Sequence, residues 1–450
     1  MAIHAKAALL PGGWQNDVRL ELAEGRLARL TAGVAPRAGD ERHAAIVPGM
    51  PNLHSHAFQR AMAGLVERRG PGADSFWTWR ELMYRFALSM TPDDVEAVAA
   101  QLYVEMLEAG FTRVGEFHYL HHDGDGRPYA DIGEMAGRIV AAARATGIGL
   151  TLLPVFYAHA GFGGTPPGEG QRRFINDIDS FGRLLERSRA LARELPGSVV
   201  GVAPHSLRAV TPDELAAITE IADSPIHIHI AEQVREVEDC LAWSGTRPVE
   251  WLFDHAEIGP RWCLIHATHM TDAETARLAA SGAVAGLCPI TEANLGDGIF
   301  PGAAFLRAGG RFGVGSDSNV LVGVGEELRQ LEYSQRLAHR ARNVLAEAEG
   351  STGRSLFAAA LAGGAQALGT GAGLIEGGAA DFVSLDLRDA PGLAGDAVLD
   401  GWIFAGNIAV DCVWVAGRKQ VEGGRHMARD AIAPRFAATM RRLLAGADHA

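Results

Sequence analysis

Short apolar runs alternate with helix-like stretches along most of the chain from residue 44 onward. The runs have the length and composition of strands that are buried on both faces of a parallel sheet. They are residues 44–50, 112–119, 149–157, 198–206, 225–232, 261–269, 283–291 and 311–319. This succession of eight strand-then-helix units favours a (β/α)8 TIM barrel over an open, doubly wound sheet.

Several stretches between these runs carry clear helix start and stop signals. Residues 91–110 begin with a threonine cap, a proline and acidic residues, and they end at a glycine. Residues 211–222 repeat this start, and residues 271–282 begin with a threonine and end at a glycine. Capping residues and terminal glycines of this kind predict helices with well-defined ends.

The two ends of the chain have a different pattern. Both contain short strand signals punctuated by glycines, and the chain closes with a helical segment. We therefore expect one small β-sandwich domain built from both termini. The expected division is 1–46 with 371–425 for the β domain, 47–370 for the barrel and 426–450 for a C-terminal helix. The glycine- and proline-rich segment 160–173 is expected to be a long, mobile loop.

Composition narrows the class of protein. Hydrophobic residues make up 48% of the 450 residues and charged residues 21%, which is ordinary for a soluble globular protein. The net charge of −13 argues against a nucleic-acid partner, because no general basic field meets phosphates. An anionic small molecule would therefore need local arginines to overcome the global field.

Compartment and membrane association follow from what the sequence lacks. The cysteines Cys240, Cys263, Cys288 and Cys412 are scattered and form no C-x-x-C pair, which indicates a reducing compartment. The N-terminus has no apolar core of a signal peptide, and no run is long enough to span a bilayer. We expect a cytoplasmic protein with no membrane partner.

Histidines gather where two of the expected strands end, which is where a barrel places its chemistry. His54 and His56 follow the first strand two residues apart, so their side chains point the same way. Taken alone, this pair fits two unrelated loop residues as well as two metal ligands. In the fifth strand either His227 or His229 could bind a metal. We prefer His229 because it lies nearer the strand end, with His227 packed one layer deeper.

Other ionisable residues lie at the ends of the fifth, sixth and eighth strands. Glu232 follows the fifth strand, His266 ends the sixth with His269 beyond it, and Asp317 follows the eighth. An isolated aspartate there would more often be a turn residue or a helix cap. The joint order and placement of all these residues favour a shared site.

Three imidazoles and a carboxylate suit Zn²⁺, with iron or another divalent metal as alternatives. A metal of this kind lowers the pKa of a water to roughly 7 in favourable zinc sites, and hydroxide then attacks an sp2 carbon. Asp317 can accept the proton of the water, and Glu232 can pass a proton to the substrate nitrogen. His266 can hold the hydroxide and the developing tetrahedral centre.

These motifs resemble the amidohydrolase superfamily over nearly the whole chain. The stretches are "PGMPNLHSH", "HIHIAE", "LIHATHM" and "GSDSN", in that order, and the tail "GLIEGGAADFVSLD" resembles its small β domain. The fourth strand ends in "APHSLR", without an obvious lysine to bridge two metals. The resemblance therefore implies a mononuclear site, with His54, His56, His229 and Asp317 as ligands.

Further stretches resemble one branch of that superfamily, which hydrolyses N-formimino-L-glutamate to N-formyl-L-glutamate and ammonia in histidine degradation. They are "HSHAFQRAMAG", "FWTWRELMY", "GEFHYLHH" and "APHSLRAV". Carried over residue by residue, the resemblance implies a substrate pocket lined by Gln59, Arg80, Tyr119, His205 and Arg208. It also implies a homodimer.

The two arginines fit a dicarboxylate substrate, since planar guanidinium groups bind carboxylates in a bidentate way. Arg80 is expected in the loop after the first strand, and Arg208 after the fourth. Each could instead be a solvated surface residue, which is the usual fate of arginine.

Two alternatives remain open on the sequence. A related deaminase of a neutral heterocycle, such as guanine or a triazine, would keep the chemistry but would not need the paired arginines. A non-catalytic relative would keep the fold as a binding module, but it would be expected to have lost a ligand or the glutamate.

Overall fold

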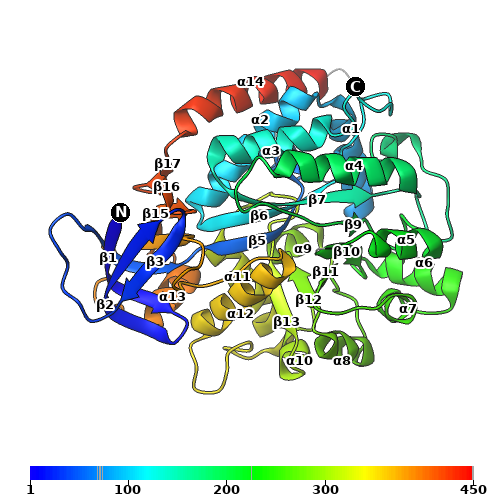
Figure 1. Cartoon of the computed structure of the whole chain (residues 1–450). Coiled ribbons are helices and arrows are strands. Elements are labelled where there is room, and N and C mark those ends of the chain that lie inside the picture. Colours follow the sequence, from blue (N-terminus) through cyan, green and yellow to red (C-terminus); the bar gives the residue numbers. More distant parts are fainter. Residues whose placement is uncertain (68, 70–71, 73, 224, 448–450) are drawn as a thin grey trace.

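A computed structural model of the chain shows a mixed α/β architecture with parallel sheets surrounded by helices (Figure 1). It describes residues 1–67, 69, 72, 74–223 and 225–447. The parallel strands occupy the centre of the molecule, and a sheet made from both ends of the chain stands at one side.

The sheet made from both chain ends is ordered β17-β16-β15-β14-β4-β1-β2-β3. Its strands are β1 (Ala2–Leu10), β2 (Gly13–Ala23), β3 (Arg26–Thr31), β4 (Glu41–Pro48), β14 (Phe382–Asp386), β15 (Ala409–Val415), β16 (Arg418–Glu422) and β17 (Arg425–His426). The antiparallel pairing of β14 with β4 joins the two ends. A separate apolar cluster that includes Leu20, Phe382 and Trp414 forms its core.

The parallel strands form two runs, ordered β5-β6-β7-β8 and β10-β11-β12-β13, with β9 paired to β7. Their bounds are β5 (Met50–Ser55), β6 (Phe111–His118), β7 (Gly149–Phe156), β8 (Val199–Val200), β9 (Ala203–Pro204), β10 (Ile226–Ile230), β11 (Trp262–His266), β12 (Val284–Leu287) and β13 (Arg311–Val314). Isolated parallel bridges Val202↔Ile226 and Ser55↔Asp317 connect the two runs. This arrangement is TIM-barrel-like.

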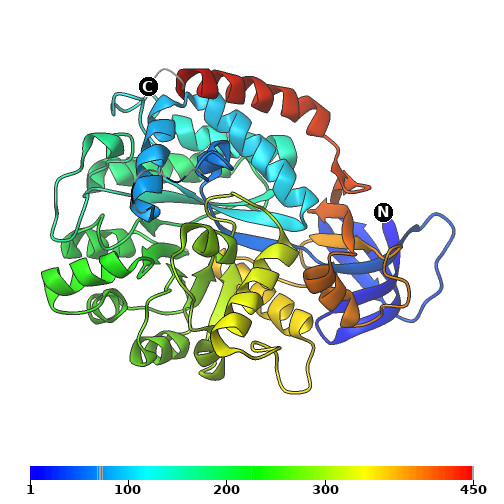
Figure 2. The same cartoon turned by 180° about the vertical axis from the view of Figure 1, so that it is seen from behind.

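Helices cover the outer faces of the parallel strands in both views (Figures 1 and 2). The α-helices are α1 (Phe76–Ser89), α2 (Pro92–Glu108), α3 (Glu134–Thr146), α4 (Ile178–Ala192), α5 (Pro212–Glu220), α6 (Val234–Ser244), α7 (Pro248–His255), α8 (Asp272–Ser281), α9 (Pro289–Leu295), α10 (Gly302–Arg307), α11 (Val324–His339), α12 (Thr352–Ala367), α13 (Ala397–Asp400) and α14 (Arg429–Ala447). Short 3-10 turns η1 (Ala57–Met62) and η2 (Glu169–Gln171) and the π-helical turn η3 (Gly401–Ala405) complete the set.

The predicted caps of α2, α5 and α8 are confirmed. Thr91, Thr211 and Thr271 each accept a hydrogen bond from the backbone N–H three residues later. Gly282 ends α8 in the left-handed region at φ +77°.

The prediction that residues 44–50 form the first parallel strand is wrong. Residues up to Pro48 belong to β4 in the terminal sheet, and the first parallel strand is β5. Between them, Gly49 donates its N–H to Asp381 O, and Met50 donates to Gly110 O on the other side. A Cβ atom on Gly49 would lie 2.2 Å from the Thr112 side chain, so the crossing requires glycine. The expected fourth strand, 198–206, is broken into β8 and β9.

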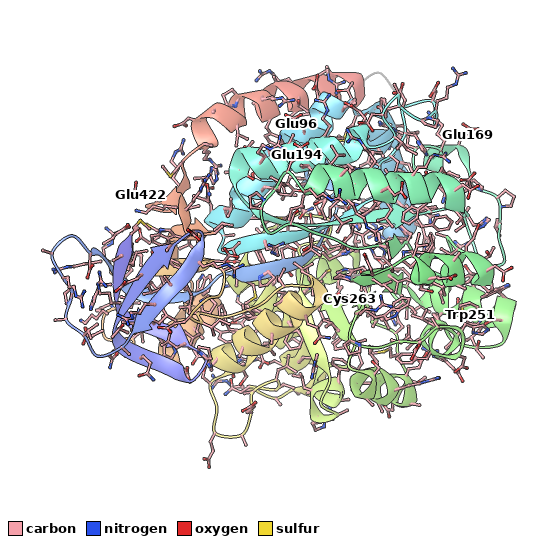
Figure 3. The ribbon with its side chains drawn as sticks, viewed as in Figure 1. Glu96, Glu169, Glu194, Trp251, Cys263 and Glu422 are labelled. Carbon is pink, nitrogen blue, oxygen red and sulfur yellow. The ribbon has the colours of Figure 1, made fainter. Side chains whose placement is uncertain are left out.

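The C-terminal helix α14 lies along α2 (Figure 1). Three arginines of α14 pair with acidic residues of α2: Arg429 with Glu108, Arg435 with Glu96, and Arg442 with Asp94. Of the segment 426–450 expected as a C-terminal helix, residues 448–450 lie outside the described residues. In Figure 3, Glu96 marks α2, Glu422 marks the end of β16 in the terminal sheet, and Cys263 marks the interior strand β11. Over the described residues, the helices are too short or too polar to cross a membrane.

Close packing of α12 on β13 gives a stability prediction. A Cβ atom on Gly363 would lie 1.9 Å from the carbonyl oxygen of Phe312, so helix and sheet would have to separate. We expect Gly363→Ala to lower the free energy of unfolding by about 1–3 kcal/mol. Thermal unfolding followed by circular dichroism measures the change.

Gly182 in α4 provides the matched control, because a Cβ atom there has no other atom within 4 Å. Gly182→Ala should stabilise the protein by up to about 1 kcal/mol through helix propensity. Equal thermal midpoints for the two variants would contradict the close contact at Gly363.

Candidate active site

The end of β5 is hydrogen-bonded to the segment that follows β13. Asp317 donates its backbone N–H to His54 O at 3.0 Å, and His56 donates to Asp317 O at 3.0 Å. Asp317 itself has φ +45°, a conformation that a non-glycine residue adopts only when its surroundings hold it. Asn319 does so here, since its side-chain amide donates to Asp317 O and His56 O.

Three imidazoles and a carboxylate meet at this junction. The Nε2 atom of His54 lies 3.2 Å from that of His56 and 3.0 Å from that of His229. Asp317 Oδ1 lies 3.5 Å from His54 Nε2 and 3.2 Å from His56 Nε2. Four ligands at zinc bond lengths in a tetrahedron are about 3.4 Å apart, so the observed spacings fit one metal ion.

The imidazole hydrogen bonds point to a cation as the missing partner. His56 Nδ1 donates to Phe117 O at 2.9 Å, and His229 Nδ1 donates to His205 O at 2.9 Å. A neutral ring that donates from Nδ1 presents a lone pair at Nε2. Lone pairs facing one another at about 3 Å repel, and a metal ion between them removes that repulsion. The ligand set therefore fits a metal, as the sequence predicted.

Protonation of the candidate ligands favours the metal-binding forms. Burial lowers the pKa of His54 to about 3 and holds the pKa of His229 well below its usual value. Burial opposes ionisation of Asp317, but the adjacent imidazoles of His54 and His56 hold the pKa of this carboxyl well below its usual range. Neutral imidazoles and a carboxylate are the species that coordinate metals.

His266 and Glu232 lie beside the ligands with different protonation. His266 Nε2 is 3.8 Å from Glu232 Oε1 and 3.8 Å from Asp317 Oδ2. Burial alone would lower the pKa of His266, but Glu232, Glu292 and Asp317 raise it to about 10. Burial raises the pKa of Glu232, although His266 and Arg208 act in the opposite sense. The site thus holds a charged imidazole next to a carboxyl with a raised proton affinity.

Two glutamates that sequence reasoning missed hold these groups in place. Glu292 of α9 lies 3.2 Å from His266 Nδ1 and also accepts the backbone N–H of Cys288. Glu236 of α6 accepts the backbone N–H groups of Ala231 and Glu232. In the sequence, the only sign that Glu236 belongs to the site is its position four residues after Glu232. No recognisable catalytic or metal-binding motif stands beside Glu292.

All five predicted substrate residues line one pocket above the ligand cluster, which we call the inner pocket. The five are Gln59, Arg80, Tyr119, His205 and Arg208. The catalytic candidates and several aromatic side chains line the same pocket: Glu232, His266, Asp317, Trp79, Tyr84, Tyr157 and Phe174. Gln59 Nε2 donates to the Tyr119 hydroxyl at 2.8 Å. The other amide atom, Gln59 Oε1, is buried and has no partner among the described residues, so it is free to accept from a ligand.

Arg80 lies on a helix, and the expectation of a loop position was wrong. Ser75 caps α1 by accepting the N–H of Trp77, and fourteen residues without glycine or proline follow. The guanidinium of Arg80 lies 4.6 Å from the Trp77 ring centroid and 5.6 Å from that of Tyr84. Arg208 is placed as expected, after β9, and its Nε atom is buried without a partner within the described chain.

The segment 160–173 is a long loop, as expected, but its end is firmly anchored. Arg173 is fully buried. Its guanidinium donates to Ala87 O and Met90 O at the end of α1 and to His122 O after β6. Glu169, four residues earlier, is by contrast on the outer surface (Figure 3). The anchored end of the loop therefore fixes α1, which carries Arg80.

Two other histidines near the predicted strand ends, His227 and His269, lie outside the ligand cluster. His227 Nε2 donates to Ala367 O at 2.7 Å, in the layer below His229. His269 Nε2 donates to Asp297 O at 2.8 Å in the loop beyond β11. In both rings, Nε2 is therefore hydrogen-bonded to a backbone carbonyl oxygen.

Comparison with known protein families shows which family the chain belongs to. The Amidohydrolase family profile matches residues 45–419, and the profile described as "Formimidoylglutamate deiminase HutF, N-terminal domain" matches residues 1–44. The chain belongs to the amidohydrolase family.

Several relatives are similar over most of their length. The chain is 55% identical to the formimidoylglutamate deiminase of Pseudomonas aeruginosa, over 98% of this chain and 99% of that protein. The 8-oxoguanine deaminase of the same organism is 27% identical over 73% of this chain and 74% of its own. A crystal structure of an amidohydrolase from Brucella melitensis is 63% identical, covers 98% of this chain and 99% of its own, and has a TM-score of 0.97.

The ligand cluster gives a prediction on metal content. His229 and His227 lie on the same strand, but only His229 faces His54. Removing a mere partner of a ligand weakens metal binding by about 10–100-fold. We expect His229→Ala to weaken metal binding by more than this factor. The variant should purify with little metal, as measured by inductively coupled plasma mass spectrometry.

His227→Gln is the matched control, because its side chain can still donate to Ala367 O. It should retain the metal content of the wild type. Loss of metal in both variants, or in neither, would contradict the assignment of His229 as a ligand.

Proposed function

We propose that this chain hydrolyses N-formimino-L-glutamate to N-formyl-L-glutamate and ammonia, the deiminase step of histidine degradation. The observation that carries the proposal is one pocket in which a metal-ligand cluster faces two arginines, Arg80 and Arg208. The formimino carbon fits the first end and the glutamate carboxylates the second. Full-length similarity to a formimidoylglutamate deiminase supports the same substrate.

The proposed resident metal is zinc, one ion per chain, held by His54, His56, His229 and Asp317. A divalent ion held this way supplies hydroxide at neutral pH, because it lowers the pKa of a water to roughly 7 in favourable sites. The solved adenosine deaminase of Xanthomonas campestris, which contains bound zinc, has the same fold with a TM-score of 0.81 over 99% of this chain and 98% of its own, at 22% identity.

The side chains around the reacting carbon divide the proton transfers. Asp317 directs Oδ1 to the ligand imidazoles and Oδ2 to His266, so Oδ2 can take a proton from the attacking water. Glu232, whose pKa burial raises, can deliver a proton to the departing nitrogen. The charged His266 lies between both carboxyls and stabilises negative charge as the carbon becomes tetrahedral.

The opposite end of the pocket binds the glutamate moiety. Arg80 and Arg208 present guanidinium groups to its two carboxylates. Tyr119, Gln59 and His205 fill the space between the arginines and the metal ligands, and the buried acceptor Gln59 Oε1 can bind the formimino N–H.

The remaining features of the proposal concern architecture and context. We infer that the parallel strands from β5 (Met50–Ser55) onward close into a (β/α)8 barrel, because the bridges at Val202 and Ser55 connect both runs. The two terminal segments, which extend to Pro48 at the end of β4 and to His426 at the end of β17, are proposed to form a two-layered β-sandwich. The cysteines are free and buried, which supports a cytoplasmic protein. A homodimer is proposed as its assembly, with neither nucleic acid nor membrane as a partner.

Ammonia release tests the reaction. Purified protein incubated with N-formimino-L-glutamate should release one ammonia per N-formyl-L-glutamate formed, as followed by a coupled ammonia assay. Asp317→Asn is the control, because it removes the negative charge of a ligand and the proton acceptor. Ammonia from the wild type at or below the level of this variant would overturn the proposed function.

Arg208 separates a dicarboxylate substrate from a neutral heterocycle. Removing one partner of a buried charge pair costs about 2–5 kcal/mol, so Arg208→Gln should lower kcat/KM for formiminoglutamate by about 100-fold or more, chiefly through KM. Arg187→Gln, which loses only a surface pair with Asp131, is the steady-state kinetic control. Unchanged kcat/KM in Arg208→Gln would instead favour a heterocycle deaminase.

A further inference from the structure

A second, outer pocket adjoins the inner pocket and shares Arg80 and Arg208 with it. Its remaining wall comes from α1, α6 and the loop after β7, through Trp77, Arg235, Trp243 and Phe162. Phe162 stacks on Trp243 with ring centroids 5.6 Å apart, so the loop is seated against α6. Arg80 and Arg208 therefore lie at the boundary between the two pockets.

The outer pocket is cationic on an acidic protein. Among the described residues that line it, Arg80, Arg208 and Arg235 face a single carboxylate, Asp239. Arg235 Nε pairs with Asp239 Oδ2 at 3.6 Å, and both side chains are more than half exposed. Exposed pairs of this kind are weak, so a carboxylate ligand can compete with Asp239 for Arg235.

Trp77 holds two of these cations together. The guanidinium carbon of Arg80 lies 4.6 Å from its ring centroid, and that of Arg235 lies 4.7 Å from the same centroid. Cation–π contact uses the face of a guanidinium and leaves its N–H groups at the edge free for a carboxylate. The buried, unpartnered Nε of Arg208 adds a donor at the boundary between the two pockets.

We propose that Arg235, with Trp77, forms an outer carboxylate-binding site that captures a dicarboxylate before it passes to Arg80 and Arg208. The inference rests on the proposed function for the identity of the substrate. Arg235 lines the outer pocket but not the inner pocket, so it acts on capture and not on the chemical step. The outer site also explains how a protein of net charge −13 attracts a dianion, because local cations steer the dianion towards the pocket.

Opposite charge changes at the outer pocket test the proposal in steady-state kinetics with formiminoglutamate. Arg235→Gln should lower kcat/KM about threefold at low ionic strength with kcat unchanged, and Asp239→Asn should raise it. Both effects should disappear at high salt, since exposed charges are screened within about 3 Å at 1 M. A structural defect would not vanish with salt.

Arg277→Gln and Asp254→Asn are matched controls. Arg277 is also about half exposed, pairs with Asp254 at 2.8 Å and lies 4.9 Å from an aromatic centroid, that of Phe253, away from both pockets. Neither control should change kcat/KM at any ionic strength.

Binding of glutarate, measured by calorimetry, provides an assay that needs no turnover. Weaker binding to Arg235→Gln than to wild type and Arg277→Gln supports the outer site. If wild type turns over formiminoglutamate and Arg235→Gln matches Arg277→Gln in both assays, the outer site is wrong and the proposed function stands. If wild type releases no ammonia, the proposed function fails, and equal glutarate binding by the two variants would then overturn the outer site separately.

Discussion

Two backbone hydrogen bonds between the end of β5 and Asp317 set the geometry on which the site depends. They fix the register of His54, His56 and Asp317 relative to one another. Because side chains alternate along an extended segment, a shift of one residue would turn His54 and His56 away from Asp317. The same contact joins the two runs of parallel strands. The element that connects the sheets is therefore also the one that gathers the ligands.

Charge is distributed unevenly along the inner pocket, and this polarity orients a substrate. The metal end contains the buried carboxyls of Glu232, Glu292 and Asp317 around one charged imidazole, His266. Burying several carboxylates is costly unless cations accompany them, so a divalent ion also balances the charge of this end. The other end presents arginines without ion-pair partners within the described chain. A molecule with an anionic tail and a basic C–N group fits in one direction only.

The sequence predicted most of the site because strand ends converge. His54, His229, His266 and Asp317 all follow or end apolar runs, and parallel strands bring their carboxyl ends together. It failed at places decided by tertiary contacts. The run from 44 to 51 contains no polar residue, yet the chain passes at Gly49 from one sheet to the other, at a point where Thr112 leaves no room for a side chain. Glu292 could not be identified, since its partner His266 lies 26 residues away on another element.

The prediction that Arg80 lies in a loop also failed at a place that tertiary contacts decide. Its helix, α1, is held at its C-terminal end by the buried guanidinium of Arg173, which donates to Ala87 O and Met90 O. Arg173 also donates to His122 O, directly beyond the strand that carries Phe117, the carbonyl partner of His56. One side chain therefore fixes the cationic end of the pocket relative to the metal ligands. The length of dicarboxylate that fits is set in part by a residue that lines neither pocket, because pocket length depends on where α1 is held.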